Sequence, residues 1–178
     1  MTEAEIFAAI ETHYNKPFAT RWVVLRNVRT ETGYTYSGSA IAQFFHDCDP
    51  LTPRYIDALA INLHPSRHFQ RVAFEIKVSR SDFLVELAEP MKSAKARAIA
   101  DRFYFAMPAG IYDSTKDNER LAALGAGVCE VHLETTVHGV FSDMSVARRA
   151  VKHEHVWPIP EAMIMSIIRN AARVPSED

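Results

Sequence analysis

Cysteine is scarce in this chain, charge is nearly balanced, and long apolar runs are missing. The two cysteines, Cys48 and Cys129, lie far apart and have no metal-site spacing, so we expect free thiols rather than a disulfide or a structural zinc site. No apolar run approaches the roughly 20 residues that a membrane-spanning helix needs. The acidic start, from Met1 to Glu5, also lacks the basic and apolar regions of a signal peptide. These absences predict a cytoplasmic protein with no membrane partner.

Apolar residues, by contrast, are plentiful enough to build a hydrophobic core. They make up 48% of the 178 residues, so disorder is not expected. The length is typical of one domain, and the sequence shows no internal repeat or low-complexity tract. We therefore expect residues 1–178 to form a single domain.

The net charge of −2 argues neither for nor against nucleic acid as a partner. Its distribution is more informative, because residues 54–102 carry nine Lys or Arg against six Asp or Glu, whereas the segments on either side are net negative. A basic middle third fits a surface that faces phosphates. Ordinary scatter of charge would also produce it.

Periodic apolar residues and turn signals divide the chain into helices and strands. The capping box from Thr2 to Glu5 predicts a helix that ends before Pro17. A long connection is expected over 30–53, with a helical turn or short strand at 39–45. Strands are predicted at 21–29, 54–63, 70–79, 102–107 and 127–135, the last of which could pair with 137–141. Further helices are predicted from the Ser79 cap to about 88, over 90–100, and over about 160–173, the last with Ile164, Ile167, Ile168 and Ala171 on one face.

The order of these elements predicts an α/β fold with a mixed β-sheet flanked by helices. The tight loop 64–68 joins strands 54–63 and 70–79 into an antiparallel hairpin. The helical crossover that follows makes strands 70–79 and 102–107 parallel neighbours.

Two carboxylates are predicted to face one another across this hairpin. Side chains alternate along a strand, so Glu75 and Lys77 share one face of strand 70–79 while apolar side chains occupy the other. The loop length pairs Leu59 with Ala73 and Asp57 with Glu75. The two acidic Cβ atoms would then lie about 5 Å apart, and like charges at that distance destabilise a sheet unless a cation lies between them.

A divalent cation held by Asp57 and Glu75 would remove this repulsion. Mg²⁺ is commonly bound by one or two carboxylates together with waters and substrate phosphate. Lys77, about 7 Å along the strand from Glu75, could activate a water or stabilise charge on the phosphate. The alternative is structural: Glu75 and Lys77 form a solvated pair, and a backbone amide satisfies Asp57. A D…ExK pattern alone is short and common, but here the strand context, the face and the register agree with the functional interpretation.

Three stretches, residues 55–60 (YIDALA), 74–83 (FEIKVSRSDF) and 100–108 (ADRFYFAMP), resemble the PD-(D/E)XK nuclease superfamily, and most of all the MmcB-type DNA-repair group of bacteria and phages. The resemblance covers about residues 20–135. It implies a nuclease-like core and a hydrolase that cuts DNA phosphodiester bonds in DNA repair or in the processing of phage or host DNA. It further implies Asp57 and Glu75 as Mg²⁺ or Mn²⁺ ligands, the Ile76 carbonyl as a third ligand, and Lys77 as the catalytic lysine.

The chain departs from this family where related proteins often carry an extra acid on the first strand. Residues 26–29 contain no carboxylate, so an acid of the first helix, Glu3, Glu5 or Glu11, could substitute for it. The alternative for each, and the simpler one, is a first-turn helix acid or a solvated surface acid. Ser79 and Asp82 could line the site as accessory residues or simply cap the helix that follows strand 70–79.

Four basic side chains beyond Lys77 are candidates for contacts with the DNA backbone: Arg80, Lys92, Lys95 and Arg97. The alternative for each is a place on a solvated helix face. Two rival functions also remain open, namely a catalytically silent DNA-binding or protein-interaction module that keeps the fold, and a homodimer or a subunit whose partner supplies DNA binding.

Overall fold

A computed structural model of the chain describes residues 1–15, 21–30, 54–136, 139–154, 156, 158–159 and 161–171. Its elements, in chain order, are α1 (Glu3–Tyr14), β1 (Trp22–Arg29), β2 (Tyr55–Asn62), the 3₁₀ turn η1 (Pro65–Arg67), β3 (Arg71–Ile76), α3 (Arg80–Ala88), α4 (Ala94–Ile99), β4 (Arg102–Pro108), α5 (Ser114–Leu124), β5 (Gly127–Thr136), β6 (Gly139–Arg148) and α6 (Glu161–Ala171). The predicted segment 39–45, Pro17 and Cys48 lie outside the described residues. No helix of the described part is long and apolar enough to cross a membrane.

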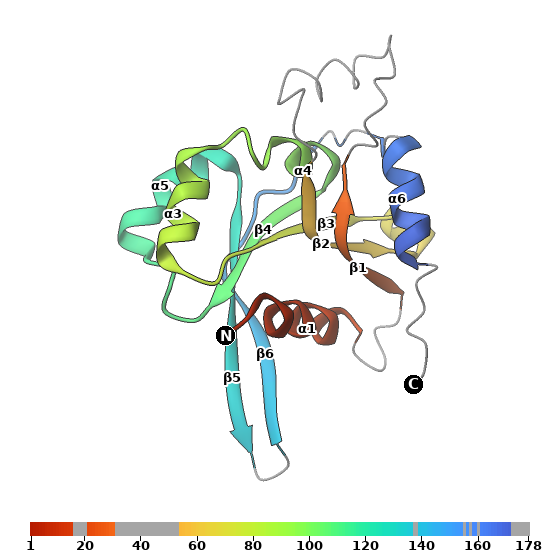
Figure 1. Cartoon of the computed structure of the whole chain (residues 1–178). Coiled ribbons are helices and arrows are strands. Elements are labelled where there is room, and N and C mark those ends of the chain that lie inside the picture. Colours follow the sequence, from red (N-terminus) through yellow and green to blue (C-terminus); the bar gives the residue numbers. More distant parts are fainter. Residues whose placement is uncertain are drawn as a thin grey trace.

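One six-stranded mixed sheet forms the centre of the fold, with its strands in the order β1-β2-β3-β4-β5-β6 (Figure 1). The pairs β1–β2, β2–β3 and β5–β6 are antiparallel. The pairs β3–β4 and β4–β5 are parallel, and their crossover connections contain α3 with α4 and α5, respectively. These pairings confirm the predicted α/β class, the mixed sheet and the hairpin of β2 with β3.

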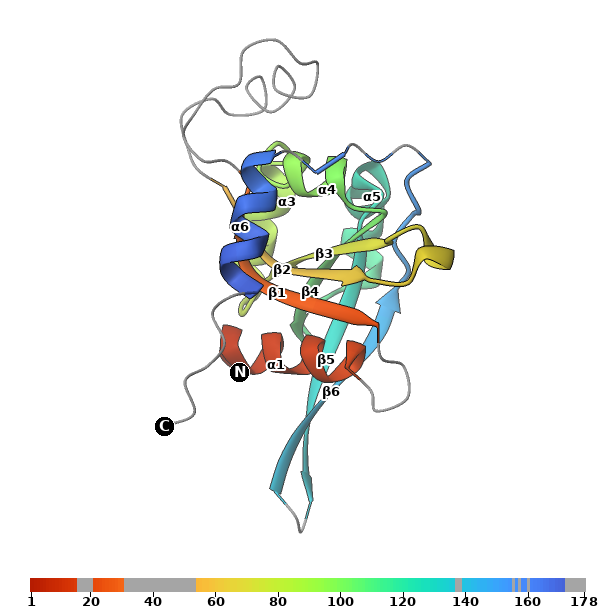
Figure 2. The ribbon, with the colours of Figure 1, turned by 90° about the vertical axis from the view of Figure 1, so that its right-hand side faces the viewer.

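Each face of the sheet carries its own hydrophobic layer. On one face, α1 buries Ile6 and Ile10 against the aromatic rings of Phe74 and Tyr104. These two rings stack on each other. On the other face, α3, α4, α5 and α6 bury a second layer around Phe83, whose ring meets Phe105 edge to face. Figure 2 shows α1 on one side of the sheet and the other four helices on the opposite side. Because the sheet is covered on both faces, functional side chains become accessible mainly at the ends of its strands.

Local signals explain where the helices begin. Thr2 and Glu5 form the predicted capping box at α1, and Ser79 accepts a hydrogen bond from the Asp82 amide at the start of α3. The second crossover helix, α5, is missing from the sequence prediction, although Asp113 caps its first turn and Gly125 ends it with a φ of +65°.

Four predicted boundaries or faces need correction. The third strand ends at Ile76 rather than at 79, and α4 begins at Ala94 rather than at 90. The predicted face of α6 is wrong in part, because Ile164 and Ile168 are 42% and 54% exposed. The helix packs on the sheet through Met163, which is fully buried and was not predicted, and through the predicted, partly buried Ile167. These two residues are four positions apart and form the neighbouring row of side chains on the helix. The last hairpin is longer than predicted, with ten residues in each strand, and extends beyond the rest of the sheet (Figure 1).

Candidate functional site

The hairpin of β2 and β3 opens at the position of Asp57. Its pairing includes Leu59 with Ala73 and ends at Ala58 with Phe74, which confirms the predicted register over these residues, whereas the predicted pair of Asp57 with Glu75 lies beyond the end of the ladder. At the next residue, a side-chain hydrogen bond takes the place of the backbone pairing. The Asp57 Oδ2 atom accepts a hydrogen bond of 2.8 Å from the Ile76 amide. This backbone contact is the one that the structural alternative foresaw for Asp57. It also fixes the carboxylate at the end of β3, where Glu75 and Lys77 follow one another.

Lys77 lies just beyond β3 and continues its pairing with β4, since its amide donates to the Ala106 carbonyl at 2.9 Å. Its side chain is only 8% exposed. The ammonium nitrogen lies 3.0 Å from Glu75 Oε1 and donates a hydrogen bond to it. The structure therefore brings the three predicted catalytic residues together, but Glu75 and Lys77 form a largely buried pair rather than the solvated pair of the structural alternative.

Glu86 of α3 completes the surroundings of Lys77 and is absent from the sequence prediction. Its Oε2 lies 3.3 Å from Lys77 Nζ, and its side chain is 8% exposed. Glu86 shares the buried face of α3 with Phe83 and Leu87. Burying an acid on the apolar face of a short helix costs free energy unless the acid is paired. The position of Glu86 on that face was the one signal in the sequence that could have identified it as part of the site.

Two more predicted residues lie at the N-terminal end of α3, close to Lys77. Asp82, whose side chain is 49% exposed, lies 3.9 Å from Lys77 Nζ. Ser79 uses its Oγ to cap the Asp82 amide at 3.2 Å. Both the capping and the accessory interpretation of this pair are therefore compatible with their positions. We refer to Asp57, Glu75, Lys77, Asp82 and Glu86 together as the Lys77 cluster.

The Lys77 cluster holds four carboxylates against one ammonium, and this imbalance shifts its pKa values. Burial, and then the charge of Asp57, raise the pKa of Glu75 to about 7. Burial also raises the pKa of Asp57, against the hydrogen bond from Ile76 and the charge of Lys77. For Lys77, burial would lower the pKa, but the Glu75, Glu86 and Asp82 carboxylates outweigh burial and raise the pKa above its ordinary value. The site thus has a protonated lysine and an excess of negative charge.

The acids of α1 differ in their relation to this cluster. Glu3 lies close enough to Asp57 for its charge to contribute to the raised pKa of that residue. Glu5 is committed to the capping box, because its Oε2 accepts a 2.6 Å hydrogen bond from the Thr2 amide. Glu11 lies in the field of Arg26 instead. Glu3 is thus the α1 acid whose charge acts on Asp57, and an accessory role for Glu11 stays a prediction.

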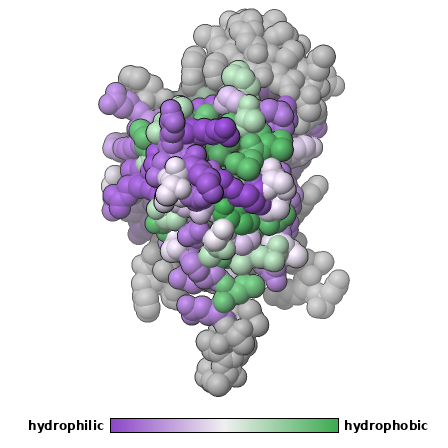
Figure 3. Space-filling model, turned by 90° about the vertical axis from the view of Figure 1, so that its left-hand side faces the viewer, coloured by the Kyte–Doolittle hydropathy of each residue, from purple (hydrophilic) through white to green (hydrophobic). Residues whose placement is uncertain are grey.

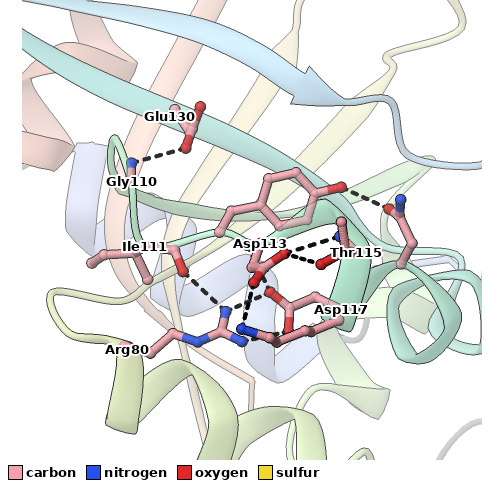
Figure 4. A network of polar contacts seen from close by, with 10 residues as sticks. Arg80, Gly110, Ile111, Asp113, Thr115, Asp117 and Glu130 are labelled. Atoms are coloured by element: carbon pink, nitrogen blue, oxygen red, sulfur yellow. Dashed lines mark hydrogen bonds and ion pairs between the residues drawn. The ribbon is translucent and has the colours of Figure 1, made fainter.

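Arg80, the first of the predicted DNA contacts, binds another part of the protein. Its guanidinium forms a two-pronged ion pair with Asp117 of α5, with Nη2 2.7 Å from Oδ1, and donates to the Ile111 carbonyl at 2.9 Å (Figure 4). The Asp117 side chain is 2% exposed. Arg80 therefore fastens the start of α3, next to Lys77, to the start of α5.

The remaining predicted DNA contacts are also engaged or buried. Lys92 Nζ pairs with Glu89 at 2.8 Å. Lys95 is only 1% exposed, so its ammonium is not available to a phosphate at the surface. Arg97 donates to the Pro90 carbonyl at 2.9 Å. The surface over α3 and α5 is nevertheless largely hydrophilic (Figure 3).

Oxygen ligands for a cation are present at the cluster, but they are not gathered into a preformed cage. Within the described ranges no three His, Cys, Asp or Glu side chains converge as a ready ligand group. Asp57 and Glu75 are the carboxylates best placed to share a hard cation, because each lies at the end of the same hairpin and each is unfavourably charged when ionised. Comparisons with protein-family models, with curated proteins and with solved structures found no match to this chain.

Proposed function

We propose that this protein is an Mg²⁺- or Mn²⁺-dependent nuclease that hydrolyses DNA phosphodiester bonds at the Lys77 cluster. The observation that carries this proposal is the convergence of Asp57 and Glu75 at the open end of the β2–β3 hairpin, with the ammonium of Lys77 3.0 Å from Glu75. Two carboxylates and a lysine at the end of a buried hairpin match the arrangement that the PD-(D/E)XK resemblance implies. The α/β core with its mixed sheet is compatible with that family.

The two carboxylates fit a divalent cation for an electrostatic reason. Burial raises the pKa of both Asp57 and Glu75, and the charge of Asp57 also raises that of Glu75, so their ionised forms are held at a cost. A cation between them would remove that cost. In an extended strand the amide and carbonyl of one residue point toward the same neighbouring strand, and the Ile76 amide points at Asp57. The Ile76 carbonyl is therefore suited to be the third ligand. A bound Mg²⁺ or Mn²⁺ would supply a water of lowered pKa and neutralise charge on the scissile phosphate.

Lys77 is suited to stabilise negative charge rather than to remove a proton. A general base must be unprotonated at working pH, but the three carboxylates around Lys77 keep its pKa above the ordinary lysine value. The ammonium would instead contact the phosphate or orient the attacking water. Glu86, 3.3 Å away, would hold the ammonium in place while Glu75 turns to the metal.

The direct test is incubation of the purified protein with labelled single- and double-stranded DNA in Mn²⁺, in Mg²⁺ and in EDTA. We expect cleavage of at least one substrate in the presence of metal and intact DNA in EDTA. Metal binding is measured in parallel by calorimetry. A protein that binds Mn²⁺ but leaves every DNA substrate intact would refute the nuclease assignment.

A catalytically silent module is the second candidate, and one observation favours it. Lys77 is satisfied by Glu75 and Glu86 within the protein, Arg80 is ion-paired with Asp117, and Lys95 is buried. A single chain with this net charge would then bind DNA with low affinity. Absence of metal binding in the same calorimetric experiment would select the silent module, and the mass of the protein in solution would show whether a homodimer or a partner subunit must be considered.

A further inference from the structure

The turn between β2 and β3, residues 63–70, exposes two large apolar side chains at the end of the hairpin opposite to the Lys77 cluster. Leu63 is 54% exposed and Phe69 is 55% exposed, one on each side of η1. We call this segment the β2–β3 tip. Exposed single apolar residues are common, but this pair occupies one short turn and is accompanied by charge of one sign.

The β2–β3 tip is ordered by its own hydrogen bonds. The amides of Arg67 and His68 donate to the carbonyls of His64 and Pro65 at 3.0 and 2.9 Å, and the His64 ring accepts from the Ser66 amide at 3.1 Å. His68 and Phe69 both have left-handed backbones, with φ of 52° and 51°. This conformation is rare for a bulky residue such as Phe and costs free energy. The turn therefore holds Phe69 in an exposed position instead of folding its ring into the core.

The charge of the tip is entirely of one sign. Residues 58–74 contain no Asp or Glu, whereas the tip itself carries Arg67 with His64 and His68. Arg67 and His68 are exposed, and Arg67 has no ion pair among the described residues. The exposed Arg21 is adjacent, because the Leu63 amide donates to its carbonyl. An exposed aromatic ring beside unneutralised arginines is the combination that proteins use to hold single-stranded nucleic acid, by stacking on a base and contacting phosphates.

We propose that the β2–β3 tip is a second nucleic-acid contact, at which Phe69 stacks on an unpaired base and Arg67 contacts the flanking phosphates. The choice of nucleic acid as the ligand rests on the proposed function. Leu63 is six residues from Asp57 along β2, which at the rise of an extended strand is roughly 20 Å. This distance corresponds to about six nucleotides of stacked DNA at 3.4 Å per step, and to fewer nucleotides of an extended single strand. The tip would therefore bind the substrate no more than about six nucleotides from the bond that is cut and would favour DNA with a single-stranded segment.

The test is binding of labelled single-stranded and double-stranded oligonucleotides, followed by fluorescence anisotropy in EDTA so that no cleavage occurs. Phe69→Ala should weaken binding of the single strand by about 5- to 100-fold, the range for loss of one stacked base, and should change duplex binding less. Arg67→Gln should reduce the slope of log affinity against log salt by about 0.7. Met91→Ala, at a residue that is 54% exposed elsewhere, and Arg120→Gln on α5 are the matched controls and should resemble wild type.

Several outcomes would overturn the proposal. Equal binding by Phe69→Ala and Met91→Ala would remove the tip from the binding surface. Binding of the wild type to anionic vesicles but not to DNA would identify the tip as a membrane contact. Loss of self-association in Phe69→Ala would identify it as a protein contact. The same experiments separate this proposal from the nuclease assignment. DNA binding that depends on Phe69 but is not followed by cleavage would support the nucleic-acid contact at the tip and refute the nuclease. Cleavage with unchanged KM and affinity in Phe69→Ala would support the nuclease and refute the contact at the tip.

Discussion

The Glu86 carboxylate lies 3.3 Å from the Lys77 ammonium, although nine residues separate the two and Glu86 occupies the buried face of its helix. Lys77 is thus held from two directions, by Glu75 of β3 and by Glu86 of α3. A metal that recruits Glu75 would leave Glu86 as the main partner of the ammonium.

Glu86→Gln should reduce DNA cleavage by about 10- to 100-fold, because the amide keeps the size of the side chain but no longer fixes a charged lysine. Mn²⁺ affinity should change little, since Glu86 contacts the lysine rather than the proposed metal ligands Asp57, Glu75 and Ile76. Glu89→Gln, three residues further along and paired at the surface with Lys92, is the control and should cleave normally. Equal rates in the two variants would exclude the positioning role of Glu86.

Lys77→Ala should bind Mn²⁺ nearly as well as wild type and cleave DNA about 10²- to 10³-fold more slowly, the usual effect of removing one group that stabilises negative charge in the transition state. Glu75→Ala should lose both metal binding and cleavage, because it removes a ligand. The measurement is metal titration beside single-turnover cleavage for wild type and both variants. If Lys77→Ala cleaves as fast as wild type, the catalytic assignment of Lys77 is wrong.

Asp57→Asn should raise the melting temperature of the metal-free protein by about 2–4 °C, equivalent to roughly 1 kcal/mol for a domain of this size. The asparagine oxygen can still accept the Ile76 hydrogen bond, while the charge that is held unfavourably by burial and by Glu3 disappears. Stabilisation by added Mn²⁺ should shrink in the same variant. Thermal unfolding in EDTA and in Mn²⁺ measures both effects, and an unchanged response to Mn²⁺ would remove Asp57 from the ligand set.

Asp117→Asn should weaken the fold at neutral pH and make it less sensitive to acid. Burial alone would raise the pKa of Asp117, but hydrogen bonds from Arg80 and from the Asp113 amide lower it below the ordinary value of 3.8. A depressed pKa contributes stability that is present above the ordinary value and is lost as pH falls through the lower value in the folded state. We expect a loss of about 2 kcal/mol at pH 7, less than for a fully buried pair because the Arg80 side chain is 34% exposed.

The wild type should therefore lose stability more steeply than Asp117→Asn below pH 4. Urea unfolding at a series of pH values gives the two curves. Parallel curves would show that the ion pair of Arg80 with Asp117 contributes nothing to acid sensitivity.

The sheet could be predicted well from the sequence where apolar residues alternate. The register of Leu59 with Ala73 followed from matching two apolar faces across a short loop, and the structure has the same register. The helix α5 was missed because the segment from Ser114 to Arg120 contains no apolar residue, so it lacks a helical periodicity. Only its end signals, Asp113 and Gly125, identify it.

The candidate site was predictable only in part, because its residues come from different elements. Asp57, Glu75 and Lys77 belong to one hairpin, and strand alternation is enough to place them together. Glu86 and Asp117 are brought into place by helix packing across 9 and 37 residues of chain. Periodicity gives the buried face of a helix but not the partner that this face meets, so neither the partner of Lys77 on α3 nor the ion pair of Arg80 with Asp117 could be foreseen.

The order of the strands in the sheet is the same as their order in the chain. Each strand after β1 can therefore join an edge that its predecessor has already formed, and no strand has to insert between two others. A chain synthesised from its N-terminus could add strands one by one, and the Asp57 carboxylate would be fixed once Ile76 of β3 has joined β2. We expect Glu86 to arrive later, with α3, so that docking of this helix gives Lys77 its second carboxylate partner and adds to the negative charge around Asp57 and Glu75.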